Sequence, residues 1–315
     1  YHDVRVGKSG LALLAFLGAG HVPGGETQHA RVADLGVNWL LSTQDATTGH
    51  FGDSEAYGHG IATYALAECY ALTREPRLGE AVKRAVQRIL SEQFSSDDAR
   101  TDGGWSYFYP SGETFDGWPR ASITAWQVMA LESARLGGIE VPDAAFDRAH
   151  EFLRNSWDAE LRRFRYSHDP ARLRSGYATL PGSTPAALFA LSLLGEDLSS
   201  PQWREAVGFV SACAPDGYRW QGEDAFVQRA AGNLYFWYYG SLALLRRGGA
   251  EWERWNLALK ESLPPAQAED GSWASLDVYC EYAGDDERDL VYSTAMCVLS
   301  LEVYYRYFTP LLRVR

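Results

Sequence analysis

The sequence predicts an all-α fold, an (α/α)6 toroid in which six inner helices form a ring inside a layer of outer helices. The first observation is a repeat: an apolar helix, an amphipathic helix and a Gly/aromatic loop recur roughly every 50 to 60 residues. The second is the contrast between the two helices of a repeat. One is apolar on nearly all sides, as expected of a helix buried all round, and the other alternates apolar and charged residues at helical spacing.

Each inner helix begins with small residues followed by an apolar run. Leu, Ala and Phe make up the whole of the runs at 11–17 and 186–191. Because such helices have no polar face, we expect them to form the inner wall of the toroid. The six openings lie at 9–12, 60–63, 122–125, 183–186, 240–243 and 293–296.

The outer helices are amphipathic. In the second of them, Val82, Val86 and Ile89 alternate with Lys83 and Arg88. Proline near the first turn and glycine near the end mark the boundaries of several of these helices. The five predicted outer helices lie near 28–44, 77–92, 142–156, 199–212 and 250–263.

Six inner helices with five outer ones leave one outer helix unaccounted for. It would precede Tyr1, or the tail after Pro310 would take its place. The chain begins at Tyr1 without an initiator methionine or a signal peptide. We therefore expect a single domain over 1–315 that is part of a longer protein.

Composition excludes several partners. The chain has 29 basic and 41 acidic residues, a formal charge of -12, and no run of Lys and Arg, so nucleic acid is not an expected partner. The longest apolar stretches, 11–19 and 234–245, are shorter than the ~20 residues that cross a bilayer, so no transmembrane segment is expected. The four cysteines are far apart and indicate no disulfide scaffold, which leaves the compartment open.

Four connections are longer than ordinary loops. They lie at 93–119, 157–181, 214–232 and 264–290. In a toroid of this kind, long loops close one end, and binding and catalytic residues concentrate on such segments. Any chemistry is therefore expected there.

A recurrent phrase follows the outer helices. Gln44 precedes Gly49-His50-Phe51, Gln93 precedes Asp102-Gly103-Gly104-Trp105, and Gln267 precedes Gly271-Ser272-Trp273. Glutamine can bond free backbone groups at a helix end, glycine permits a tight turn, and the aromatic ring packs adjacent repeats together. This reasoning favours a structural role for the phrase.

The phrase resembles the QW motif of squalene-hopene and oxidosqualene cyclases and the Gly-Phe repeats of protein prenyltransferase β subunits, over the whole chain. The segments 16–21, 126–131 and 301–307 look like those of bacterial proteins with prenyltransferase/squalene-oxidase repeats. The resemblance implies a terpene cyclase-like toroid with an apolar isoprenoid or lipid in its central cavity.

The family's catalytic residues are mostly absent. Class II cyclases protonate their substrate with the middle Asp of Asp-x-Asp-Asp, and this tetrad does not occur here. The nearest carboxylates are Asp97-Asp98, Asp285-Asp286-Glu287 and Asp116. Asp116 precedes the third inner helix and is the best-placed proton donor, although a loop carboxylate there is also an ordinary structural feature.

The zinc ligands of the prenyltransferases are also missing. The family's Tyr-His-Thr falls on Tyr292-Ser293-Thr294, and the spacing of Asp277 and Cys280 differs from the family's Asp-x-Cys. We therefore predict no metal and no other cofactor.

Aromatic residues and one histidine complete the candidate site. His59 is a candidate base for deprotonating a carbocation, and the alternative is a structural donor. Aromatic faces stabilise a cation by roughly 0.5 to 2 kcal/mol each, and the alternative for these rings is core packing. The predicted substrate-binding residues are Tyr57, Trp118, Trp126, Tyr235, Trp237, Tyr239 and Tyr292.

Three functions follow as hypotheses. The first is the isoprenoid-binding or cyclase-like toroid. The second is a non-catalytic scaffold for a protein partner, in a larger and envelope-associated or multidomain protein. The third is a carbohydrate-active enzyme, in which loop tryptophans stack on sugars while paired carboxylates act. Its candidate residues are Trp105, Trp118, Trp220, Asp102, Asp116, Glu223 and Asp224. Glu68, Glu132 and Glu302 are expected to anchor inner helices.

Overall fold

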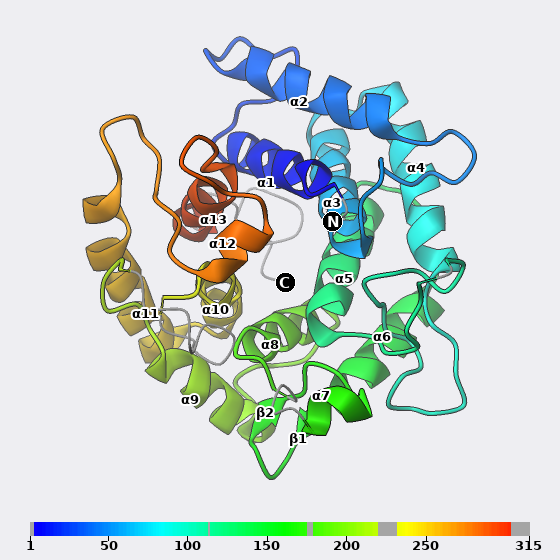
Figure 1. Ribbon diagram of the computed structural model, residues 1–315, viewed down its shortest axis with the longest axis vertical. Helices are drawn as coiled ribbons and strands as arrows, with labels where there is room; N and C mark the ends of the chain where they lie inside the picture. Colours follow the sequence, from blue (N-terminus) through cyan, green and yellow to red (C-terminus); the bar gives the residue numbers. More distant parts are fainter. Residues whose placement is uncertain (1–2, 113, 175–178, 220–231, 304–315) are drawn as a thin grey trace. The chain divides into compact units, whose positions relative to one another are not determined.

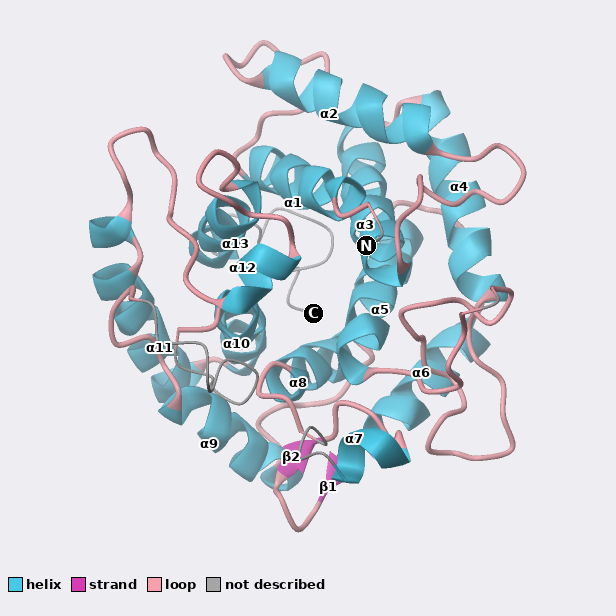
Figure 2. Cartoon of the chain, viewed as in Figure 1, coloured by secondary structure: helices cyan, strands magenta, loops and turns pink. Residues whose placement is uncertain are grey.

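A computed structural model describes residues 3–112, 114–174, 179–219 and 232–303, in which the regular secondary structure is almost entirely helical (Figures 1 and 2). The predicted apolar helices are confirmed as α1 (Arg5–Gly18), α3 (Ala56–Thr73), α5 (Ala121–Leu136), α8 (Ser183–Leu193), α10 (Leu234–Arg247) and α13 (Val291–Leu301). The predicted amphipathic helices are confirmed as α2 (Ala30–Thr43), α4 (Pro76–Ser91), α6 (Asp143–Asn155), α9 (Arg204–Ala212) and α11 (Gly249–Ser262).

Short elements occupy the long loops. The loop after α6 contains a small antiparallel hairpin and a short helix, and the loop after α11 contains another short helix. In the hairpin, Trp157 pairs with Phe164. These elements are β1 (Trp157–Asp158), β2 (Arg163–Phe164), α7 (Pro170–Arg174), the 3-10 helix η3 (Pro264–Ala266) and α12 (Val278–Tyr282). Another 3-10 helix, η1 (Pro201–Trp203), leads directly into α9.

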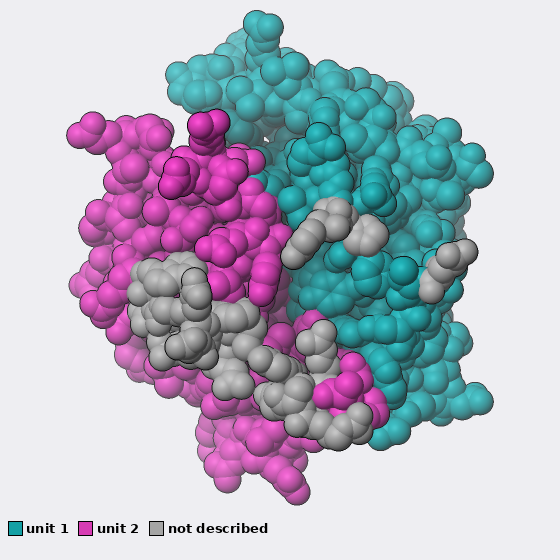
Figure 3. Space-filling model, viewed as in Figure 1, with its two compact units in different colours: residues 1–152, 304–315 teal, residues 153–303 magenta. Residues whose placement is uncertain are grey.

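The chain divides into two compact units, one ending its main segment at Phe152 and the other spanning Leu153–Val303 (Figure 3). Each unit has its own core of helices. The single domain over 1–315 stays a prediction. In the residues that the structure describes, no helix is long and apolar enough to cross a membrane.

In the first unit, α3 packs between α1 and α5, with α2 beside α1 and α4 beside α3. Glycine permits the close approach of these helices. A Cβ atom on Gly10 would lie 2.9 Å from Cγ2 of Ile61, and one on Gly60 would lie 2.8 Å from Nε2 of Gln127. Gln127 donates a hydrogen bond of 2.8 Å to the carbonyl of Ala56, so its amide is fixed across the two helices.

In the second unit, α10 packs between α8 and α13, and α9 and α11 lie along them. Helix α10 begins at Leu234, earlier than the small residues at 240–243 that the repeat suggested. The side chain of Asn233 caps it by accepting a hydrogen bond from the backbone of Phe236 at 2.8 Å. The aromatic run therefore forms the first turns of the helix. A Cβ atom on Gly240 would lie 2.5 Å from the ring of Trp255.

The recurrent phrase joins neighbouring outer helices. Gln44 donates to the carbonyls of Gly49 at 3.0 Å and of Ala81, on α4, at 2.9 Å. Gln93 does the same with Gly103 at 2.8 Å and with Ala145, on α6, at 2.9 Å. Each glutamine thus satisfies one carbonyl in its own loop and one in the next outer helix, a structural role of the kind that the sequence suggested.

The aromatic residue of the phrase is fixed from the same side. The indole of Trp105 donates to the carbonyl of Ile89 and that of Trp273 to the carbonyl of Leu263, each at 2.8 Å. Both rings are buried. A buried indole N–H requires such a partner, so the ring docks the loop on the end of the preceding outer helix.

Candidate functional site

Asp116 lies in the loop before α5 and is bound by Arg120, the residue at the start of that helix. Nη1 and Nη2 of Arg120 donate to Oδ1 and Oδ2 at 2.9 and 2.6 Å. The hydroxyl of Ser106 donates at 3.1 Å and the backbone N–H of Trp118 at 3.0 Å. The side chain of Asp116 is 42% exposed and that of Arg120 is 3% exposed. One face of the carboxylate is therefore held and the other remains accessible.

The electrostatics of this pair favour an ionised Asp116. Burial by itself raises the pKa of Asp116, but the hydrogen bonds and the charge of Arg120 outweigh it, and the pKa lies below its usual value. The carboxylate therefore carries its negative charge at neutral pH. That state suits acceptance of hydrogen bonds from a ligand and does not suit donation of a proton.

Aromatic residues lie beside the pair. The rings of Tyr57 and Tyr107 lie 5.4 Å apart, and Cζ of Arg120 lies 5.7 Å from the centre of the Tyr107 ring. Tyr57, Tyr107 and Trp118 are all half-buried. The carbonyl of Tyr107 accepts from the backbone N–H of Ala56 at 2.9 Å, which fixes the loop to the start of α3. We call this set the Asp116 cluster: Tyr57, Ser106, Tyr107, Asp116, Trp118 and Arg120.

The structure thus brings together three residues that the sequence singled out, Tyr57, Asp116 and Trp118. Sequence reasoning missed Ser106, Tyr107 and Arg120. A signal for Arg120 was available, since it stands four residues after Asp116 at the entrance to a buried helix. Nothing in the sequence indicated that Tyr107 would face Tyr57.

A second buried carboxyl, Asp277, joins the starts of α10 and α12 in the second unit. It accepts from the backbone N–H groups of Leu234, Tyr279 and Cys280, at 2.9, 2.8 and 3.3 Å. Burial raises the pKa of Asp277 to about 6, because these three hydrogen bonds offset only part of the cost of removing a charge from water. The carboxyl therefore titrates close to neutral pH.

Phenols and thiols surround Asp277. Burial, together with the charge of Asp277, raises the pKa of Tyr279 and of Tyr292 above the usual range. The hydroxyl of Tyr218 donates to the carbonyl of Ala274. We call this set the Asp277 cluster: Tyr218, Asp277, Tyr279, Cys280, Tyr292 and Cys297. Only Tyr292 in this set belongs to the predicted substrate-binding residues.

Three other predicted substrate-binding residues lie in the cores of the two units. Trp126, Trp237 and Tyr239 are each at most 1% exposed. Trp126 packs 6.4 Å from Tyr64, and Tyr239 lies 4.9 Å from Tyr235. Tyr235 itself is half-buried. Core packing, the alternative role for these rings, accounts for Trp126, Trp237 and Tyr239. A role of these three residues in binding stays a prediction.

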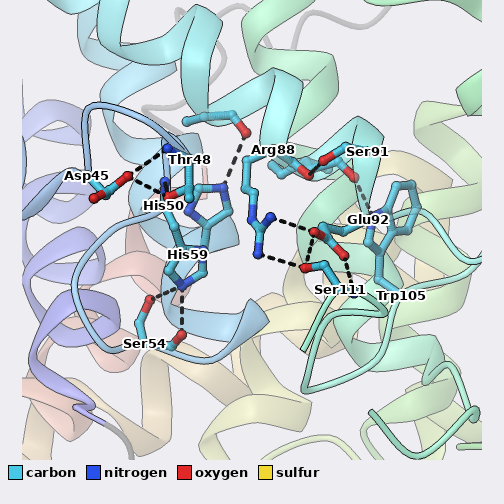
Figure 4. Close-up of polar contacts among 12 residues, drawn as sticks. Asp45, Thr48, His50, Ser54, His59, Arg88, Ser91, Glu92, Trp105 and Ser111 are labelled. Carbon is cyan, nitrogen blue, oxygen red and sulfur yellow. Dashed lines mark hydrogen bonds and ion pairs between the residues drawn. The ribbon is translucent and has the colours of Figure 1, made fainter. Parts of the chain in front are cut away.

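His59 is fully buried between α3 and α4 and stacks on His50, with ring centres 4.5 Å apart and an interplanar angle of 15° (Figure 4). Its Nε2 lies 3.2 Å from the carbonyl of Ala85. Burial holds the pKa of His59 well below its usual value, so the ring is neutral. His59 is not among the residues that contact Asp116.

The residues proposed for a sugar-binding groove are only partly assembled. Trp105 is buried, and Asp102 pairs with Arg148, on α6, at 2.7 Å. Both side chains therefore have structural contacts that fix their loop. Trp220, Glu223 and Asp224 lie outside the described residues. Across the described ranges, no group of three or more His, Cys, Asp or Glu residues is placed to hold a metal ion.

The predicted glutamate anchors are buried. The side chain of Glu132 is 8% exposed and pairs with Arg135 at 2.5 Å, on the same helix. Glu68 and Glu302 are buried as well. Glu68 and Glu132 lie in apolar helices and Glu302 directly follows one, and a buried charge there requires compensation.

The comparisons with known proteins identify the fold. No family model and no curated sequence matches the chain. A possible GH105 family member from Salmonella enterica matches 96% of this chain and 83% of its own, with a TM-score of 0.64 at 15% identity. A family 76 mannosidase from Bacteroides thetaiotaomicron matches 97% and 88%, with a TM-score of 0.64 at 12% identity. The chain has the α/α-toroid fold.

A terpene cyclase shares this toroid fold. A variant of the type II terpene cyclase MstE from Scytonema, in complex with merosterolic acid A, matches 95% of this chain and 86% of its own. The TM-score is 0.59 at 15% identity. The resemblance to terpene cyclases therefore holds at the level of the toroid fold, which carbohydrate-active enzymes share. At such identities the fold does not select a function, and the site must be argued from its own residues.

Proposed function

We propose that the protein is a carbohydrate-active α/α-toroid enzyme whose Asp116 cluster binds a sugar. The observation that carries this proposal is the state of Asp116, an ionised carboxylate that is held by a buried guanidinium and is 42% exposed. It stands beside half-buried aromatic residues from the start of α3 and from the loop between α4 and α5.

Sugars match this combination of groups. An ionised carboxylate accepts charge-assisted hydrogen bonds from hydroxyl groups, which are short and strong. Tyr57, Tyr107 and Trp118 offer ring faces and edges for the C–H surface of a pyranose, together with polar groups for its rim. A hydrocarbon ligand placed here would remove water from the carboxylate without replacing its hydrogen bonds, which is costly.

The neighbouring folds are compatible with this assignment. Two of the proteins compared above carry glycoside hydrolase family names, and a D-mannose isomerase has the same fold at a TM-score of 0.64. Their names provide a starting panel of ligands. The local chemistry of Asp116, and not the likeness, gives the reason to test them.

The experiment is direct. We would incubate the purified protein with mannose, α-1,6-mannotriose and a panel of neutral oligosaccharides. Binding is followed by ligand-detected NMR and turnover by mass spectrometry. The variant Asp116→Asn keeps the shape of the side chain and removes its charge, and it is expected to lose binding. Asp98→Asn is the matched control, because Asp98 is 38% exposed and pairs with Arg100 at 2.7 Å.

The outcomes separate the hypotheses. Saccharide binding that is lost in Asp116→Asn and kept in Asp98→Asn supports the proposal. Binding or conversion of squalene or a prenyl diphosphate, with no saccharide response, refutes it. No response to either class also refutes it and favours the scaffold for a protein partner.

A second candidate, a cyclase-like isoprenoid enzyme, is favoured by Asp277. An acid that protonates an apolar substrate must keep its proton in a low-polarity site, and a raised pKa is the mark of such a group. Tyr279 and Tyr292 would supply aromatic faces for a cation. Product analysis with squalene and prenyl diphosphates tests it, since turnover by the unaltered protein must disappear in Asp277→Asn.

A further inference from the structure

The stacked rings of His50 and His59 hold the loop 44–54 against α3 and α4. His50 lies in the loop and His59 on α3 (Figure 4). The ring of Tyr109 meets both histidines edge-on, at 5.6 Å from His50 and 6.1 Å from His59. These three rings, which we call the histidine stack, join two loops to two helices.

The hydrogen bonds of the stack fix the position of each imidazole proton. Nε2 of His50 lies 2.7 Å from the carbonyl of Ser54, and Nε2 of His59 lies 3.2 Å from the carbonyl of Ala85. A carbonyl only accepts, so each Nε2 carries the hydrogen and each Nδ1 is a bare lone pair. Both Nδ1 atoms are buried, and neither has a partner among the described residues.

The two lone pairs do not form a metal site. The ring planes are nearly parallel, with an interplanar angle of 15°, so the lone pairs lie in separate planes and do not converge on one point. A metal bound by two imidazoles requires both nitrogens to point at it. What the arrangement does establish is that a second proton, bound at Nδ1 of either ring, would have no hydrogen-bond acceptor among the described residues.

The charged side chains near the stack on α4 and in the loop are engaged by other groups. On α4, Arg88 pairs with Glu92 at 2.6 Å, and Cζ of Arg88 lies 5.1 Å from the centre of the Tyr109 ring. Both oxygens of Glu92 are also engaged by Ser111, at 2.6 and 3.1 Å. In the loop, Asp45 accepts from the backbone of Thr48 at 2.6 Å.

Burial is the largest influence on the pKa of His50 and, with the charge of Arg88, lowers it. The hydrogen bond to Ser54 and the charges of Glu92 and Asp53 act in the opposite direction and do not outweigh burial. For His59, burial, the neighbouring His50 and Arg88 lower the pKa, against the hydrogen bond to Ala85. On balance, burial opposes a positive charge on either ring.

We propose that the histidine stack is an acid-sensitive latch, which holds the loop 44–54 closed while both imidazoles are neutral and releases it when either ring takes up a proton. A proton on Nδ1 of either ring creates a buried N–H without an acceptor, beside a second imidazole and near a guanidinium. Release exposes the charged ring to water, which removes the penalty.

The direction of the pH effect follows from linkage. Both pKa values are lower in the closed state than in the open one, so the open state binds more protons under acidic conditions. The closed state has its full stability relative to the open state above about pH 6.5 and becomes less stable as the pH falls below that value. Each histidine contributes up to about tenfold per pH unit, and the pair up to about a hundredfold.

The latch is connected to the Asp116 cluster through two short segments. Tyr57 and His59 lie in the first turn of α3, and Tyr107 and Tyr109 lie in one loop. Release would therefore move Tyr57 and Tyr107, and acid would weaken ligand binding there. This consequence rests on the proposed function, whereas the release itself does not.

Hydrogen exchange of the full chain tests the latch without any ligand. We would measure protection at about pH 7, 6 and 5, corrected for intrinsic exchange rates. Protection of residues 44–54 and 105–111 is expected to fall by more than about tenfold per pH unit below pH 6.5, while α5 stays protected. If the protection of both segments stays unchanged between pH 7 and pH 5, the proposal is overturned.

Two further measurements make the result specific. His50→Phe keeps a stacking ring and cannot be protonated, so the pH slope is expected to drop to that of one histidine. His150→Gln, on α6 beside Glu151, is the matched control and should leave the slope unchanged. If His50→Phe does not fold, NMR titration of the unaltered protein decides, because a His59 ring that titrates near pH 6.5 while the loop stays protected refutes the latch.

Discussion

Arg120 donates hydrogen bonds to both carboxylate oxygens of Asp116. The side chain of Arg120 is buried, whereas that of Asp116 is 42% exposed. The asymmetry has an energetic consequence. Loss of the carboxylate removes two charge-assisted hydrogen bonds from a buried guanidinium, whereas loss of the guanidinium leaves a carboxylate that water can still reach.

The two single variants should therefore differ in stability. We expect Asp116→Ala to lower the free energy of unfolding by about 2 kcal/mol and Arg120→Met to lower it by about half of that. Chemical denaturation of the two variants and the unaltered protein measures the difference. Equal losses would mean that the carboxylate does not compensate the buried charge.

Gly103 should not tolerate a side chain. Its φ is +85°, and a Cβ atom would collide with the carbonyl oxygen of Arg148. Gly20 is the matched control, because its φ is +84° and a Cβ atom there meets nothing within 4 Å. Gly20→Ala should cost about 1 kcal/mol of backbone strain, and Gly103→Ala at least about 2 kcal/mol more. Thermal unfolding of both variants checks the contrast, and similar melting temperatures would contradict it.

Gln93 should matter more than Gln267, although both belong to the same phrase. Gln93 is buried and bonds two carbonyls, whereas Gln267 is exposed and its amide bonds the carbonyl of Gly271 at 2.9 Å. Gln93→Leu removes two buried hydrogen bonds and should cost about 2 kcal/mol, and Gln267→Leu less than about 0.5 kcal/mol. Denaturant titration measures both, and a large loss in Gln267→Leu would show that exposure does not set the cost.

Asp277 should make the starts of α10 and α12 more stable in mild acid. Its pKa is about 6 when folded and about 3.9 when exposed, so the folded state binds the extra proton between these values. This stabilisation is complete below about pH 4 and disappears as the pH rises through 6, opposite in sign to the histidine stack. Hydrogen exchange in α12 against pH measures it, and Asp277→Asn should abolish the dependence. An unchanged dependence in that variant would assign the effect to another group.

The helices were largely predictable, because their pattern is local. The apolar and amphipathic periods place α4 within one residue at each end, at Pro76–Ser91 against a prediction of 77–92. The start of α10 was not predictable in this way. Small residues mark the openings of the other inner helices, whereas α10 begins with an aromatic run capped by Asn233. Tertiary packing of the rings overrides the local signal there.

The candidate site was predictable only in part. Asp116 stood out by its position, but its pairing with Arg120 depends on how the loop folds back on the helix. Asp277 entered the sequence reasoning as an unsuitable zinc ligand, and its contact with Leu234 joins residues far apart in the chain. The stacking of His50 on His59 depends on a loop closing over two helices, which no periodicity records.

The glutamine hydrogen bonds that link one outer helix to the next also set the order in which the loops can fold during synthesis. The amide of Gln44 cannot complete its bonding until Ala81, 37 residues later, has left the ribosome, and that of Gln93 must wait for Ala145, 52 residues later. Each loop is thus finished by a helix that does not yet exist when the loop emerges. A nascent chain arrested before the later helix should be cut by proteases at the waiting loop, and one extended past that helix should resist them.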